Sequence, residues 1–398
     1  MMVDRARRQR RRLLALVAMA AGAVSCTDST SGAPWCAVDD PDAVLRVNGP
    51  EERPMMLRAA WRQRGADPRN SFGRPFDLTV RSDGWTAVAD LGLRAPILLS
   101  PSGNWNGPAV EAGSGENQIG VPGSVRWSAG GNLLVADPTA AKILEVPVPG
   151  AVVTGRLDLS GEAATRYRAV SGLREFLLGS DGLLVERRWF NQGPGAEGIG
   201  TAGLVSYDVV SGTGPDTLMS VETRFVRGVG LAGYSPGHLQ PLMGAGPGGA
   251  IALAGDIPEY RVRILGSDRT DSLVVCRTVD ALPLSDDERG QVSEGEEVSR
   301  SMAALAGAPV AERPLAMGRV FIGGDGRLWV QRQRERVTTG YPEGATYDFF
   351  APGGEYEGTV TAPPGAILFG SGGGLVVGVY RDPENRPWVT GWHLVRVD

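Results

Sequence analysis

The sequence is poor in the residues that build most metal and redox sites. Its 398 residues include three cysteines, two histidines and a single lysine, Lys142. The histidines, His238 and His393, lie far apart in the chain, and two distant imidazoles with few thiols cannot supply the usual ligands of a transition metal. We therefore predict neither a metal site nor a bound cofactor.

Long apolar runs are also scarce, which limits how the chain can meet a membrane. The run Leu13–Val24 has twelve residues, too few to span a bilayer comfortably. It follows an arginine-rich segment, and the small residues Ala23 and Ser25 suit a signal peptidase. We predict that residues 1–25 are a cleaved signal peptide; the alternative is a short anchor that remains.

The three cysteines suggest a processing scheme. Ala-Val-Ser-Cys, which ends at Cys26, resembles a bacterial lipobox, although Ala23 stands where leucine is usual. We predict a lipid on Cys26, a tether over residues 26–42, and a periplasmic or cell-surface lipoprotein, with plain secretion as the alternative. Lipidation leaves Cys36 and Cys276 as a pair that an oxidising compartment would bridge. Two unpaired buried thiols are the other possibility.

The mature chain lacks positive charge. Removing residues 1–25 leaves 34 basic and 44 acidic side chains, a net charge of −10. An acidic domain has no electrostatic reason to bind nucleic acid. The predicted partner is a small-molecule or protein ligand, with membrane contact through the Cys26 lipid alone, and we expect a monomer.

Glycine and proline are abundant, with 57 and 28 residues, yet 42% of the chain is apolar. This composition favours many short strands and turns. Six units place a glycine-containing hairpin turn before an apolar run. The turn glycines are residues 84, 131, 182, 249, 326 and 373, which are 47, 51, 67, 77 and 47 residues apart. Three of these intervals suit a four-stranded propeller blade of about 40–50 residues.

The repeated text supports a family resemblance. The second unit reads GSGE, VP and GGNLLVAD, and the fifth reads DGRLWV. On these motifs, residues from about 70 to 398 resemble the six-bladed β-propellers of the NHL-repeat kind found in secreted bacterial proteins. The resemblance implies an all-β fold with one propeller domain over residues 43–398. It implies little about function, because propellers host many unrelated activities.

Two parts of the chain depart from the repeat. Ser285-Asp286-Asp287-Glu288 reads as a capping box, so we predict an inserted helix over residues 285–306 with a solvated face. The alternative is that this helix docks a partner. The sixth unit is one strand short. We predict that the N-terminal run Ala43–Val47 supplies this strand and closes the ring; the alternative is that it packs elsewhere.

Two motifs in the sequence match enzymes by chance. GYSPG at residues 233–237 matches a nucleophile elbow, but Pro236 follows the serine and a strand is expected next. GAGPGG at residues 244–249 matches a dinucleotide-binding loop, but it lies in a hairpin with no helix after it. We predict no catalytic residue.

Charged residues end the second strand of most units. In a propeller these positions would ring one face of the central channel, where carboxylates and guanidiniums can hold a polar ligand. The alternative is that they satisfy turns and pair with each other. The candidates are Asp90, Asp137, Arg187, Asp256, Arg332, Arg381 and Asp382.

The sequence favours a non-catalytic ligand- or protein-binding module at the cell envelope. One alternative is a lactonase-like hydrolase or lyase that uses channel-face carboxylates and calcium; another is a purely architectural envelope protein. Clustering of the candidate aspartates within metal-ligand distance would favour the enzyme.

Overall fold

The computed structural model divides into two compact units, Met1–Ala37 and Val38–Asp398. It describes residues 36, 42–65, 67, 71–148, 152–159, 161, 176–178, 183–190, 199–208, 213–224, 242–254, 261–267, 269–279, 317–332 and 344–397. The predicted signal peptide, Cys26, Asp256 and the predicted helix over 285–306 lie outside these residues. No helix in the described part is long and apolar enough to cross a membrane.

The second unit is built of β-strands in sheets whose pairing is mainly antiparallel. The first sheet contains β3 (Pro75–Val80), β4 (Thr86–Asp90), β5 (Ala95–Leu99) and β6 (Trp105–Pro108). The second contains β7 (Ser124–Trp127), β8 (Leu133–Asp137), β9 (Lys142–Val146) and β10 (Gly155–Asp158). The third contains β11 (Phe176–Leu178), β12 (Leu183–Phe190), β13 (Ile199–Asp208) and β14 (Thr213–Arg224).

The remaining sheets include the N-terminal strands. The fourth contains β15 (Leu242–Ala245), β16 (Ile251–Ala254), β17 (Arg261–Leu265), β18 (Asp271–Arg277) and β1 (Val44–Asn48). An eight-stranded sheet runs in the order β19 (Met317–Ile322), β20 (Leu328–Arg332), β21 (Thr346–Phe350), β22 (Tyr356–Thr361), β2 (Pro54–Gln63), β25 (Pro387–Arg396), β24 (Leu375–Arg381) and β23 (Ala366–Gly372).

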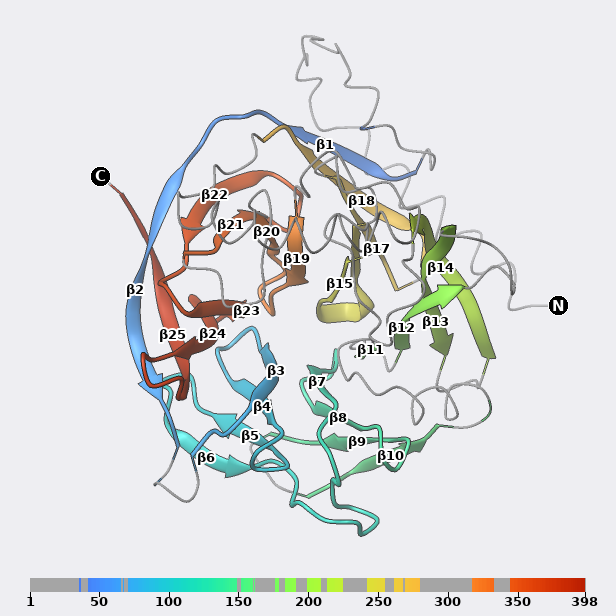
Figure 1. The fold of residues 1–398 in the computed structure, drawn as a ribbon, viewed down its shortest axis with the longest axis vertical. Helices are drawn as coiled ribbons and strands as arrows, with labels where there is room; N and C mark the ends of the chain where they lie inside the picture. Colours follow the sequence, from blue (N-terminus) through green and yellow to red (C-terminus); the bar gives the residue numbers. More distant parts are fainter. Residues whose placement is uncertain are drawn as a thin grey trace, which may run out of the picture. The chain divides into compact units, whose positions relative to one another are not determined.

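The innermost strands follow one another around a central axis. In the order β3, β7, β11, β15, β19, β23, each contacts the next, and β23 contacts β3 (Figure 1). The sheets therefore form a β-propeller. The second strands TAVAD and LLVAD are buried at each position, because the neighbouring sheets cover both faces and select a continuous apolar run.

The hairpin turns between first and second strands contain the predicted glycines. Gly84, Gly131, Gly249, Gly326 and Gly373 have φ values of 93°, 81°, 80°, 80° and 60°. These left-handed conformations favour glycine over any residue with a Cβ atom. The glycine turns thus fix the position of the first hairpin in each of these sheets.

Other glycines let the inner strands converge at the axis. A Cβ added to Gly244 of β15 would lie 2.6 Å from the Val320 carbonyl oxygen of β19, and one added to Gly246 would lie 2.6 Å from the Ile322 side chain. GAGPGG therefore serves close packing between two sheets and the short 3₁₀ turn η4 (Pro247–Gly249).

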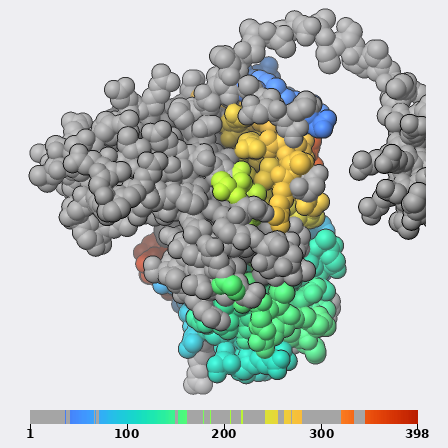
Figure 2. Space-filling model, turned by 90° about the vertical axis from the view of Figure 1, so that its right-hand side faces the viewer, coloured from blue at the N-terminus to red at the C-terminus, as the bar shows by residue number. Residues whose placement is uncertain are grey.

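The N-terminal strands form a belt on the outer edge of the sheets. Strand β1 pairs in parallel with β18, and Figure 2 shows the blue N-terminal residues beside the gold residues of that sheet. Strand β2 pairs with β25 and, at its start, with β22. The strand that completes the last sheet is therefore β2, and the prediction that Ala43–Val47 does so was wrong.

Trp61 explains why β2 takes this place. A Cβ added to Gly391 of β25 would lie 2.4 Å from the Trp61 ring, and one added to Gly103 would lie equally close. The Trp61 indole also donates a hydrogen bond to the Pro101 carbonyl, at 3.2 Å. The two glycines make room for the large ring, which anchors β2 on the last and first sheets.

Candidate functional site

Among the side chains that the structure describes, the charged residues at the ends of the second strands do not meet at one site. Asp90 accepts hydrogen bonds from the backbone amides of Gly73, Arg74 and Leu93, at 3.1, 3.0 and 2.7 Å. Burial raises the pKa of Asp90, and these amide bonds act in the opposite direction. Its carboxylate holds the turns around it.

Asp137 occupies the same position in the next sheet. It accepts hydrogen bonds from the backbone amides of Gly120, Thr139 and Ala140, at 2.8, 2.9 and 3.2 Å, and from the Thr139 hydroxyl at 2.6 Å. The side chain is buried. The alternative left open by the sequence, that these charges satisfy turns, therefore describes both aspartates.

Arg187 lies in β12, paired across the sheet with Leu204. Within the described residues, no group of three or more histidine, cysteine, aspartate or glutamate side chains could hold a metal ion.

Cys36 and Cys276 are both buried and both disulfide-bonded. A bridge between these two remains the sequence-based prediction.

Arg332 belongs to a charge cluster made of Glu52, Arg277, Arg332 and Asp348. Arg277 and Asp348 are both fully buried, with Nη1 of the arginine 2.6 Å from Oδ2 of the aspartate. Glu52 Oε1 lies 2.9 Å from Arg332 Nη1 and 3.4 Å from Arg277 Nη2. Two positive and two negative charges meet here, so the cluster is balanced.

The surroundings fix the protonation of this cluster. Burial raises the pKa of Glu52, but the Thr359 hydrogen bond and the two arginines outweigh it and lower the pKa. Burial alone would lower the pKa of Arg277, but the attraction and hydrogen bond of Asp348 outweigh burial and raise the pKa. The Arg277 guanidinium also lies 3.7 Å from the centre of the Tyr356 ring. The cluster joins the β1–β2 connection to β18, β20 and β21.

Sequence reasoning missed three members of the cluster. A signal was available, because Asp348 interrupts the apolar strand TYDFF and Arg277 follows LVVC. A charge inside a buried apolar run requires a partner. Sequence alone could not identify Glu52 as a partner of these charges, since Glu52 lies more than 220 residues away from both Arg277 and Asp348.

Arg381 and Asp382 serve the β24–β25 hairpin. Arg381 donates to the carbonyl and side-chain oxygens of Asn385, at 3.0 and 3.3 Å. Asp382 accepts from Trp388 Nε1 at 3.1 Å and from the Arg386 backbone and side chain at 2.8 and 2.7 Å. Burial alone would raise the pKa of Asp382, but these donors lower it to about 2.

This shift predicts an acid-dependent loss of stability. Since the folded-state pKa of Asp382 lies below the ordinary aspartate value of 3.8, its contribution is present above pH 4 and disappears as the pH falls toward 2. We expect Asp382→Asn to flatten the decline of Tm between pH 5 and pH 2.5, measured by thermal unfolding. Glu384→Gln removes a more exposed charge from the same hairpin and is the matched control. A decline as steep in Asp382→Asn as in the native chain contradicts this assignment.

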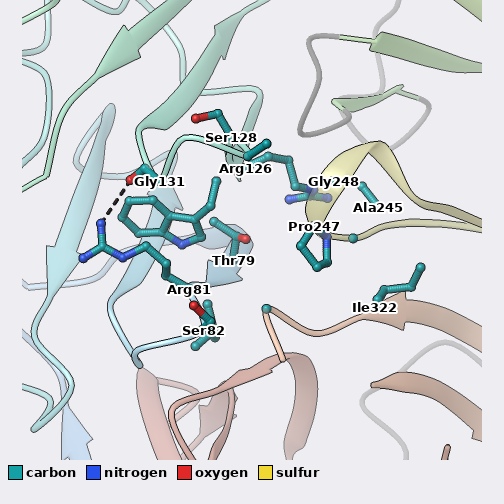
Figure 3. A pocket seen from close by; sticks show the side chains of 15 residues that line it. Thr79, Arg81, Ser82, Arg126, Ser128, Gly131, Ala245, Pro247, Gly248 and Ile322 are labelled. Carbon is teal, nitrogen blue, oxygen red and sulfur yellow. Dashed lines mark hydrogen bonds between the residues drawn. The ribbon is translucent and has the colours of Figure 1, made fainter. Parts of the chain in front are cut away.

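A cavity of about 300 Å³ lies at the axis of the propeller. It is lined by the turns that join first to second strands in four sheets, namely β3–β4, β7–β8, β15–β16 and β19–β20 (Figure 3). Asp90 and Asp137 end β4 and β8, so they lie at the opposite ends of those strands from the cavity. Asp90 and Asp137 therefore do not line this cavity.

Arg81 forms part of the cavity wall. Its Nη1 donates to the carbonyls of Gly131 and Val148, at 3.0 and 3.3 Å, and its Nε and Nη2 both donate to Asp83 at 2.8 Å. The guanidinium lies 4.9 Å from the centre of the Trp127 ring. The Arg81 hydrogen bonds lower the pKa of Asp83. These contacts fix Arg81 between the first and second sheets.

Arg126 reaches further into the space. It leaves β7 and extends toward Pro247 and Gly248 on the β15–β16 turn (Figure 3). Its Nη1 donates to Asp77 Oδ2 at 2.7 Å and to the Val125 carbonyl at 2.5 Å. Because Asp77 lies on β3, this ion pair also joins two sheets.

The rest of the cavity wall is mixed. Val80, Pro247 and Ile322 supply apolar surface, while Thr79, Ser82 and Ser128 supply hydroxyls. The charged side chains among the lining residues in the described chain are Arg81 and Arg126. Sequence reasoning missed this site, although an arginine within the otherwise buried inner strand SVRW was a usable signal.

Comparison with known proteins gives the fold and no family. No family model and no curated protein matches the chain. A protein of Bacteroides fragilis NCTC 9343 assigned as exported has 10% identity and a TM-score of 0.51, covering 89% of this chain and all of that one. A gluconolactonase from Xanthomonas campestris has 9% identity and a TM-score of 0.35, covering 86% and 98%. The first likeness shows a shared propeller fold.

Proposed function

We propose that the protein is a non-catalytic binding module outside the cytoplasm, a six-bladed β-propeller whose axial cavity takes a small molecule. The blade number is supported by the six innermost strands, which contact one another in a closed circuit. The location is supported by the secretion signal read in residues 1–25 and by the fold shared with an exported protein.

The axial cavity is the observation that carries this proposal. Its volume lies at the small end of the range for ligand pockets, about 300–1,000 Å³, and its mixture of apolar walls and few polar groups is typical of them. Arg81 and Arg126 are held by partners on two sheets. A ligand would therefore meet side chains that are already ordered, which reduces the entropic cost of binding.

The lipid anchor on Cys26 is part of the same proposal. Residues 27–42 would separate the membrane surface from the belt formed by β1 and β2. Incorporation of a labelled fatty acid that is lost in Cys26→Ser tests the anchor. We do not propose the lactonase-like alternative, which needs carboxylates that can bind calcium or act on a substrate. The carboxylates of Asp90 and Asp137 instead accept hydrogen bonds from backbone amides.

A matched pair of variants tests the binding site. Ala129 and Ala140 are both exposed and lie in turns at opposite ends of β8, but of the two only Ala129 lines the cavity. A thermal-shift screen of residues 27–398 against sugars, organic acids, lactones, peptides and divalent ions should find a ligand. At about 100 times its Kd this ligand adds about 2.7 kcal/mol, or roughly 2–4 °C in Tm.

We expect Ala129→Trp to abolish the shift, because the indole enters the cavity, and Ala140→Trp to retain it. Isothermal titration calorimetry of the two variants then gives the affinities. Loss of binding in both variants, or in neither, places the ligand elsewhere on the molecule and contradicts the proposal.

A further inference from the structure

We propose that the ligand of the axial cavity is a small organic carboxylate, an inference that rests on the proposed binding function. The guanidinium donors of the lining carry it. Arg81 and Arg126 contribute two guanidiniums, and no described lining residue carries a carboxylate. Asp83 and Asp77 pair with these arginines from behind the lining, so the cavity itself presents guanidinium N–H donors to a ligand.

Arg126 has the geometry to hold the carboxylate. A guanidinium has five N–H donors in a planar fork. The Asp77 and Val125 contacts both fall on Nη1. Among the described residues none bonds to the Nε and Nη2 edge, which can pair with two oxygens of one carboxylate. Bidentate pairing of this kind is stronger and more directional than a single hydrogen bond. The side chain is 15% exposed, which limits competition from water.

Arg81 acts as a positioning residue. Its donors are directed to Asp83, Gly131 and Val148, so it adds charge to the cavity without a free edge for the ligand. Its partner Asp83 is 54% exposed, and solvent screens that negative charge more than it screens the half-buried guanidinium. Asp77 balances the charge of Arg126 as Asp83 balances that of Arg81, so the attraction for an anion comes from the N–H donors of Arg126 and not from an excess of positive charge.

The apolar wall determines the rest of the ligand. Val80, Pro247 and Ile322 form an apolar surface. A polyanion such as a phosphorylated sugar would lose its hydration against this surface without gaining hydrogen bonds in return. One guanidinium edge matches one carboxylate, and the cavity volume excludes long chains. The fitting chemistry is one carboxylate attached to a short apolar or aromatic body.

Matched acids and amides test the ligand class. Ligand-observed NMR on residues 27–398 would compare phenylacetate with phenylacetamide and hexanoate with hexanamide. We expect each acid to bind at least tenfold more tightly than its amide, and this ratio to fall to about one in Arg126→Gln. The preference should also weaken with added salt, as expected for charge pairing.

A second pair of variants covers the chance that Arg126→Gln fails to fold. Pro247 lies on an exposed turn at the cavity, so Pro247→Glu adds a negative charge there and Pro247→Gln adds the same bulk without charge. We expect Pro247→Glu to weaken the acids by about tenfold relative to Pro247→Gln, with the amides unchanged.

The possible failures are distinguishable. If amides bind as tightly as acids, or if only neutral members of the thermal-shift panel bind, the carboxylate inference is wrong and the binding function stands. An acid preference that survives both Arg126→Gln and Pro247→Glu places the anion elsewhere and also overturns the inference. If no probe or panel member binds, the proposed function fails as well.

Discussion

Replacing Asp348 by alanine is expected to lower the free energy of unfolding by about 3–5 kcal/mol, because it leaves a buried guanidinium without its closest counter-ion. Arg277 and Asp348 are both fully buried and 2.6 Å apart. The Arg277 side chain would retain the Glu51 carbonyl at 2.9 Å and the partly exposed Glu52 at 3.4 Å. Neither replaces a buried carboxylate.

Denaturant unfolding with and without a double substitution separates charge from packing. Arg277→Met with Asp348→Leu removes both charges and fills similar space, so we expect it to recover most of the loss seen in Asp348→Ala. Glu355→Ala, which breaks the exposed ion pair between Glu355 and Arg46, is the control and should change stability by less than about 1 kcal/mol. An Asp348→Ala variant as stable as this control would refute the assignment.

Removing the N-terminal belt is expected to abolish cooperative unfolding. A chain of residues 64–398 lacks β1 and β2, which exposes the edges of β18 and β25 to non-native pairing. It also lacks Trp61, whose ring packs on Gly103 and Gly391, and Glu52 of the charge cluster. A chain of residues 43–398 keeps all of these elements.

Calorimetry and light scattering of the two chains test the belt. Both lack Cys36, so the state of the cysteines is matched and the belt is the variable. We expect a single sharp transition for residues 43–398 and a broad or absent transition with aggregation for residues 64–398. Equal transition midpoints and enthalpies for the two chains would show that β2 adds nothing to closure.

The parts of the fold that depend on local chemistry could be predicted from sequence. The turn glycines and the buried runs TAVAD and LLVAD can each be recognised within a few residues of sequence, and the strands lie where these patterns predict them. The position of β1 depends on distant contacts instead. Arg46 donates to the Gly353 carbonyl at 3.1 Å, and Asn48 to the Gly354 carbonyl at 3.1 Å. Contacts separated by some 300 residues leave no local pattern.

The candidate site was harder to predict for the same reason. Asp90 and Asp137 look like ligands at strand ends, but the turns beside them present backbone amides that need acceptors. Arg126 matters because Asp77, 49 residues earlier, orients it across a sheet boundary. The charged strand ends were visible in the sequence, whereas the positions of the cavity-lining turns follow only from the closed ring.

The most direct test of the axial binding site is a crystal structure of residues 27–398 soaked with the tightest ligand from the thermal-shift screen. Our account predicts ordered density for the ligand between Arg126 and the Pro247–Gly249 turn, in contact with Val80 or Ile322. Density for the ligand at the ends of β4 and β8, beside Asp90 and Asp137, or on the outer edge of the sheets with the cavity unchanged would contradict it.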